Sequence, residues 1–165
     1  MGAGLVDRLA RLSAWIFFAI GFMLLYEVVA RYLFNAPTIW AEELSRLFQL
    51  WASWLAAAHL LESRQLIAIG ILRGRLPAAL ERVRAACVLA VIALVAAGGL
   101  VWGLWIVAES IRFGRKTATM LDLPLWVSEI AVPVGCALLL VQVAAEARRL
   151  WRDPAFRLDF ARDAD

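Results

Sequence analysis

Ionisable residues lie within or beside the long apolar runs of this chain. Glu27 precedes Arg31 by four residues, and Glu42 stands in the same relation to Arg46. On a helix this spacing places acid and base on one face, with the acid first, which favours an ion pair. Charges near lipid are costly and are candidates for a proton or ion relay. We favour paired charges that fix helix register and depth, because these residues and three further acids map toward the outer interface: Glu43, Glu109 and Glu129.

The chain offers no set of residues for catalysis or for holding a metal or haem. His59 is the only histidine, whereas histidine zinc sites and bis-histidine haem sites need several ligands. Cys87 and Cys136 lie inside apolar runs, where a thiol usually behaves as a small hydrophobic side chain. The nucleotide-binding P-loop and the common hydrolase motifs are missing from the sequence. We therefore expect no enzyme and no cofactor.

Composition indicates the environment of these residues. Of the 165 residues, 64% are hydrophobic, and the mean hydropathy is +0.77. Soluble domains are about 45–50% apolar, so the excess indicates lipid as the solvent. A membrane-spanning helix needs about 20 largely apolar residues, and four stretches qualify, at about 12–34, 39–61, 85–111 and 125–147. The sequence predicts an all-α integral membrane protein with four transmembrane helices in one domain, 1–152, followed by a polar tail, 153–165.

The distribution of basic residues predicts the orientation. Most of the 17 lysines and arginines lie at the N-terminus, in the loop 62–84 and in the C-terminal tail. Because basic residues are retained on the cytoplasmic side, both termini are predicted to be cytoplasmic. The net charge of +3 then indicates a membrane surface and no nucleic acid. The loop 62–84 holds isoleucines beside arginines and is either a short interfacial helix or an ordinary connection.

Turn residues and small residues mark the helix ends and close contacts. The segment from Asn35 to Pro37 ends the first helix, and Thr38 is the expected N-cap of the second. Pro124 opens the fourth helix, and Pro133 is expected to kink it. A G-x-x-x-G motif at 99–103 allows two helix backbones to approach closely.

The tryptophans fall into two groups. Trp40 and Trp126 stand at the outer starts of the second and fourth helices, as in an interfacial aromatic belt. Four others lie deeper as i,i+3 pairs, and they suit packing against another helix, in this chain or in a partner: Trp51, Trp54, Trp102 and Trp105.

The joining segment of the first two helices resembles a known family. Residues 30–46 read ARYLFNAPTIWAEELSR, and the stretch resembles the R-Y-x-F-N-x-P-x-x-W-x-E-E-x-x-R of the small permease subunit of tripartite ATP-independent periplasmic (TRAP) transporters, the DctQ-like family. LPLW at 123–126 followed by PVG at 133–135 is similar to the opening of the family's fourth helix. The resemblance covers nearly all of 12–150. The family often has a histidine and an aspartate after helix two, where this chain has Leu66 and Gly70.

This resemblance implies a subunit of a secondary transporter in the bacterial inner membrane. The small subunit would scaffold a large permease subunit, which takes up an organic acid with a sodium gradient after a periplasmic substrate-binding protein delivers it. Membrane lipid is the remaining expected partner. The residues expected to serve structure or the subunit interface are Glu27, Arg31, Asn35, Pro37, Trp40, Glu42, Glu43, Arg46, Trp51, Trp54, Pro124, Trp126, Pro133 and Gly135.

A self-sufficient four-helix exporter, coupled to protons, is the alternative. Such exporters use a glutamate of the first helix, and Glu27 is the candidate here. Three features favour the transporter subunit over the exporter. Glu27 lies near the outer end of its helix, Arg31 follows it by four residues, and the chain has a long basic tail. The exporter predicts proton flux coupled to a substrate from this chain alone, and the subunit predicts none.

Overall fold

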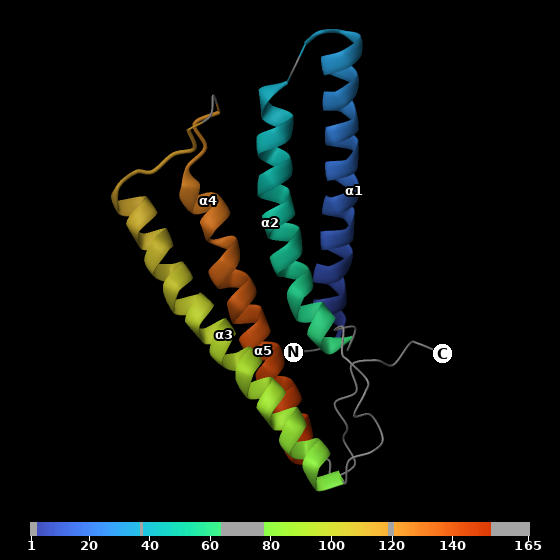
Figure 1. Ribbon diagram of the computed structural model, residues 1–165, viewed down its shortest axis with the longest axis vertical. Coiled ribbons are helices and arrows are strands. Elements are labelled where there is room, and N and C mark those ends of the chain that lie inside the picture. The colour runs from blue at the N-terminus through green and yellow to red at the C-terminus, as the bar shows by residue number, and fades with distance from the viewer. Residues whose placement is uncertain (1–2, 37, 64–77, 119–120, 153–165) are drawn as a thin grey trace.

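The computed structural model describes residues 3–36, 38–63, 78–118 and 121–152. In these ranges the chain is helical, apart from turns and one isolated bridge between Lys116 and Pro124. The helices are α1, Ala3–Leu33; α2, Ile39–Glu62; α3, Ala78–Arg112; α4, Leu125–Glu129; and α5, Ala131–Arg152 (Figure 1). The all-α prediction is confirmed.

Several sequence predictions fall outside the described residues. They concern Pro37, most of the loop 62–84 with its two departures from the family pattern at Leu66 and Gly70, and the tail 153–165. The alternatives for the loop therefore stay open.

Two of the helices begin before the predicted spans. α1 begins at Ala3 and α3 at Ala78, whereas the apolar stretches begin at about 12 and 85. Hydropathy marks the part of a helix that suits lipid, while backbone hydrogen bonding continues through polar turns that lie in water. Three segments of the described chain are long and apolar enough to cross a membrane: Val6–Leu33, Leu80–Arg112 and Leu125–Arg152. α2 is less apolar, because it carries charged residues in its first turns and at its end.

The interruption expected from Pro133 is present and separates α4 from α5 at Ile130. A proline has no N–H, so the carbonyl of Glu129 cannot receive its usual bond from position 133. The amide of Ile130 still donates to Trp126, at 3.0 Å, and that of Val134 donates to Ile130, at 3.2 Å. The two helices therefore follow one another closely along the same path.

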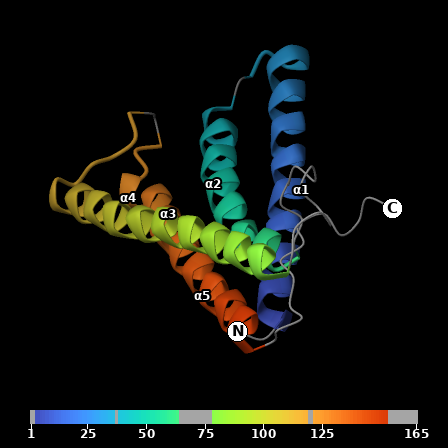
Figure 2. The same ribbon diagram turned by 60° about the horizontal axis from the view of Figure 1, so that its bottom comes forward.

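The helices form two antiparallel hairpins. α1 packs on α2, α3 packs on α4 and α5, and the hairpins meet where α2 packs on α5. Figures 1 and 2 show the second hairpin inclined to the first, so that the two separate toward one end. We call this the turn end, because it carries the α1–α2 and α3–α4 turns. Since the outer helices α1 and α3 do not pack together, the described helices form an open layer and not a closed bundle.

The buried core lies near the opposite end, where Leu61 in the last turn of α2 joins residues of α3 and α5. Its members are Leu61, Ala85, Leu89, Val143 and Leu150. By contrast, large apolar side chains on α1 and α3 point outward, with Phe22 59% and Leu94 75% exposed. Apolar surfaces of this extent need lipid or another protein against them.

Glycines allow the closest helix contacts. A Cβ atom at Gly103 of α3 would lie 3.0 Å from Cδ of Pro133, and one at Gly99 would lie 2.8 Å from Sγ of Cys136. The predicted close approach at the G-x-x-x-G motif is therefore confirmed, and its partner is α5 of the same chain. A Cβ atom at Gly135 would lie 2.5 Å from Cε3 of Trp54 in α2, so the hairpins also meet over a glycine.

We expect Gly135→Ala to destabilise the fold, because its methyl group would overlap the Trp54 ring and force the two hairpins apart. Overpacking of this kind costs about 1–3 kcal/mol. Gly98→Ala is the matched control, since no atom lies within 4 Å of its Cβ position. It should leave stability unchanged or raise it, because alanine favours helix over glycine. Thermal unfolding of both variants in detergent checks this, and equal melting temperatures would contradict it.

Candidate functional site

The carboxylate of Glu27 joins the end of α1 to the start of α2. It accepts bonds from Arg31 at 2.7 and 3.1 Å, from the Thr38 amide at 2.9 Å and from the Thr38 hydroxyl. Thr38 is the N-cap residue of α2, as predicted, but its side chain makes no capping bond. Glu27 takes that role from the preceding helix, because an acid suits the positive end of the helix dipole. The predicted ion pair with Arg31 is confirmed, and Glu27 is only 6% exposed.

The turn that follows α1 brings Thr38 back to Glu27. Asn35 adopts a left-handed conformation with φ of 48°, which asparagine tolerates better than most residues. The amide of Ala36 then donates to the carbonyl of Ala30 at 3.0 Å and closes the helix end. Tyr26 and Trp40 pack across the same turn, with ring centroids 5.9 Å apart. The family-like stretch 30–46 therefore builds one hydrogen-bonded corner.

The neighbouring acids of α2 have different surroundings. Glu42 forms the predicted ion pair with Arg46, and both side chains are exposed. Both carboxylate oxygens of Glu43 are buried, and they have no hydrogen-bond partner within the described part of the chain. Arg46, three residues after Glu43, is bound to Glu42, and the position four residues after Glu43 is Leu47.

A further ion pair lies at the turn between α3 and α4. Glu109 binds Arg115 at 2.8 Å, and the amide of Leu125 donates to the Arg115 carbonyl at 3.1 Å. One carboxylate oxygen of Glu129 is buried without a hydrogen-bond partner in the described ranges. The predicted ion pairs of Glu27 and Glu42 are therefore confirmed, and Glu109 is paired as well, with Arg115 and not with the nearer Arg112. Glu43 and Glu129 do not follow the expectation of paired charges within the described residues.

The four deeper tryptophans have two different environments. Trp51 donates its indole N–H to the carbonyl of Val127 in α4 at 3.1 Å, and Trp54 packs over Gly135. Trp102 and Trp105 pack edge to face on α3, with centroids 5.8 Å apart, and are more than half exposed. The first pair therefore joins the hairpins, while the second faces outward.

The predicted residues at the two helix starts also gather at the turn end. Trp40 and Trp126 lie in the first turns of α2 and α4 and are 41% and 40% exposed. Pro124 is the N-cap residue of α4, with φ of −62° and ψ of 124°. This placement is the one an aromatic belt at a membrane interface would need.

Sequence reasoning missed polar contacts away from the turn end. Glu146 of α5 is 1% exposed and binds Arg149 at 2.8 Å, a pair that the i,i+3 spacing could have revealed. The Ser13 hydroxyl donates to the carbonyl of Ala52 at 2.6 Å and ties α1 to α2; no sequence pattern indicates this bond. Among the described residues, no group of three or more histidine, cysteine or acidic residues could hold a metal.

These features define a helical membrane protein in which one buried acid, Glu27, joins two helices. The sequence model of the family described as "Tripartite ATP-independent periplasmic transporters, DctQ component" matches residues 20–153. The match covers most of the chain, so the chain belongs to the DctQ family of TRAP transporter components. This is a family of transporter components and not of enzymes, and the resemblance inferred from the sequence is confirmed.

A curated relative gives the same family. The chain is 28% identical over 131 residues to the "Isethionate TRAP transporter permease protein DctMQ" of Oleidesulfovibrio alaskensis. The aligned part is 78% of this chain and 20% of that relative. The chain therefore spans about a fifth of the length of the curated relative that it matches.

Removing the charge of Glu27 should loosen the corner between α1 and α2. We expect Glu27→Gln to lower the melting temperature of the detergent-solubilised protein clearly, because bonds to a charged carboxylate are the stronger ones. Glu42→Gln is the control and should have little effect, since exposed ion pairs contribute little. If the two variants have equal melting temperatures, Glu27 does not stabilise the α1–α2 hairpin.

Proposed function

We propose that this chain is the small membrane subunit of a TRAP-type secondary transporter in the inner membrane of a bacterium. It would hold a large permease subunit in the bilayer while that subunit takes up an organic acid with a sodium gradient. A periplasmic binding protein would deliver the organic acid. Membership of the DctQ family supports the proposal. The relative is named DctMQ, and this chain aligns with only 20% of its length. We infer that the rest of that relative corresponds to the large permease subunit with which this chain would assemble.

One structural observation carries the scaffold role. The described helices form an open layer in which α1 and α3 do not pack together, and both present large apolar side chains outward. A transporter that works alone must enclose a path for its solute. An open layer with apolar faces suits attachment to a larger membrane protein, with lipid covering the rest.

The exporter alternative has less support. Its coupling residue would be Glu27, which must release and rebind a proton during transport. That carboxylate receives bonds from Arg31 and from the amide and hydroxyl of Thr38. These bonds join the end of α1 to the start of α2, so the geometry supports a connecting role for the carboxylate of Glu27.

We also propose that all four long segments cross the membrane and that both termini are cytoplasmic. α2 has 24 residues, which correspond to about 36 Å at 1.5 Å per residue. It packs between α1 and α5, two helices that belong to apolar segments of spanning length. Its charged first turns would then reach the outer interface, where water and lipid headgroups satisfy them.

Membrane-impermeant labelling tests this orientation. In a variant with Cys87 and Cys136 replaced by alanine, we expect single cysteines at Ala36 and Gly114 to react with an impermeant maleimide in intact cells. Cysteines at Asp7 and Arg82 should react only after permeabilisation. If α2 did not cross, positions 36 and 82 would react from the same side, and the four-span proposal would fail.

Reconstitution tests the function. Vesicles that contain this chain, a large permease subunit encoded beside it and the matching binding protein should accumulate an organic acid when sodium is high outside. Vesicles with any one of the three missing should not. Proton flux coupled to a substrate in vesicles that contain this chain alone would support the exporter instead.

A further inference from the structure

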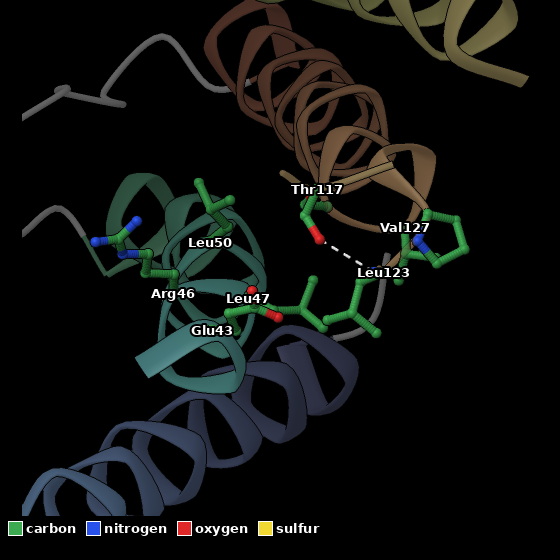
Figure 3. Close-up of a pocket in the computed structure, with 9 residues that line it drawn as sticks. Glu43, Arg46, Leu47, Leu50, Thr117, Leu123 and Val127 are labelled. Atoms are coloured by element: carbon green, nitrogen blue, oxygen red, sulfur yellow. Dashed lines mark hydrogen bonds between the residues drawn. The ribbon is translucent and has the colours of Figure 1, made fainter. Parts of the chain in front are cut away.

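A cavity of about 220 Å³ lies at the turn end, where the two hairpins separate. Figure 3 shows its position between α2 and the segment that leads from α3 into α4. The lining residues are mostly apolar side chains with a few polar ones: Glu43, Arg46, Leu47, Leu50, Thr117, Leu123, Pro124, Val127 and Ser128. Small-molecule sites usually measure about 300–1,000 Å³, so this cavity suits a single side chain better than a whole solute.

Glu43 is the exception among the polar side chains of this cavity. Arg46 binds Glu42, the Thr117 hydroxyl accepts a bond from the Leu123 amide at 3.0 Å, and the Ser128 hydroxyl donates to Leu125 at 2.9 Å. The two oxygens of Glu43 are buried and make no hydrogen bond within the described residues. Figure 3 shows its carboxylate on the side of α2 that faces Leu123.

This arrangement calls for a positive charge. A carboxylate removed from water without a partner is strongly disfavoured. Glu42 and Arg46 pair with one another, so among the described residues no cation is paired with the carboxylate of Glu43. The cavity therefore suits a side chain that carries one positive charge at the end of an apolar stem, as lysine and arginine do.

We propose that the cavity receives a lysine or arginine side chain of the large permease subunit and that the cation of this side chain binds the carboxylate of Glu43. The apolar stem would lie along Leu47, Leu50 and Val127. The inference rests on the proposed function, because it presupposes that a large permease subunit binds this chain. It adds the site and the chemistry of one anchoring contact.

The charges argue against a zwitterionic phospholipid in the same place. Such a lipid brings a phosphate together with its ammonium group, and the phosphate would need a cation of its own. Arg46 is the cation at the cavity, and Glu42 already occupies it. A basic side chain adds one positive charge to one negative charge and leaves nothing unpaired.

The test measures binding of the large permease subunit to Glu43→Gln in nanodiscs. We expect binding at least about 30-fold weaker than that of the unaltered chain, as is typical when one partner of a buried interfacial charge pair is lost. Glu109→Gln removes the same charge at the same end of the molecule, from α3, and should bind normally. If Glu43→Gln also binds normally, the anchor is refuted, whereas failure of the unaltered chain to bind would refute the proposed function itself.

The stability of the isolated chain separates an interface role from an internal one. Because Glu43 makes no hydrogen bond within the described residues, Glu43→Gln should leave the melting temperature unchanged or raise it while it weakens binding. A variant that loses stability as much as binding would show that the carboxylate serves this chain's own fold, and it would overturn the proposal.

Photo-crosslinking identifies the occupant directly. With p-benzoylphenylalanine at Leu47, we expect a crosslink to the large subunit within about one helical turn of a lysine or arginine. The control, with the same group at Leu94 on the outer face of α3, should not capture that residue. Crosslinks from position 47 to lipid alone, or to a part of the large subunit without a basic residue, would overturn the proposal.

Discussion

A charge near lipid must find a counterpart in protein, in water or in lipid headgroups, and this constraint determines much of the architecture. Glu27 lies within an apolar segment that extends to Leu33, yet it is buried and bonded to Arg31 and Thr38. One carboxylate thus neutralises a cation and caps the next helix. The α1–α2 hairpin depends on this corner, and the corner fixes the level at which the charged first turns of α2 lie.

Small residues and tryptophans then join the two hairpins. Trp54 fits over Gly135, and Trp51 binds the backbone at Val127. Glycines of α3 likewise accept Pro133 and Cys136 of α5. Helices in lipid associate through such close packing, because lipid is as apolar as their side chains. The result is an open layer whose outer helices keep apolar faces available to a neighbouring subunit, as a member of the DctQ family would need.

The pairing of charges also shows where the chain is incomplete by itself. Glu27, Glu42 and Glu109 have cations within reach on their own helix or in the adjoining turn. Glu43 and Glu129 face other helices and keep buried oxygens without partners in the described part of the chain. Glu43 also lines the cavity at the turn end, and these two observations together are the basis of the proposed anchor.

The sequence by itself determined the helical class, the apolar stretches, the ion pairs at Glu27 and Glu42, and the family, because each depends on residues close together in the chain. The break near Pro133 and the start of α2 after Thr38 were predictable for the same reason. The tertiary structure alone decided that Trp51 and Trp54 face inward and that Ser13 bonds to α2. It also decided that Glu43 and Glu129 have buried oxygens without partners among the described residues. These facts depend on which helices become neighbours, and that follows from packing between segments far apart in the chain, for which local spacing carries no signal.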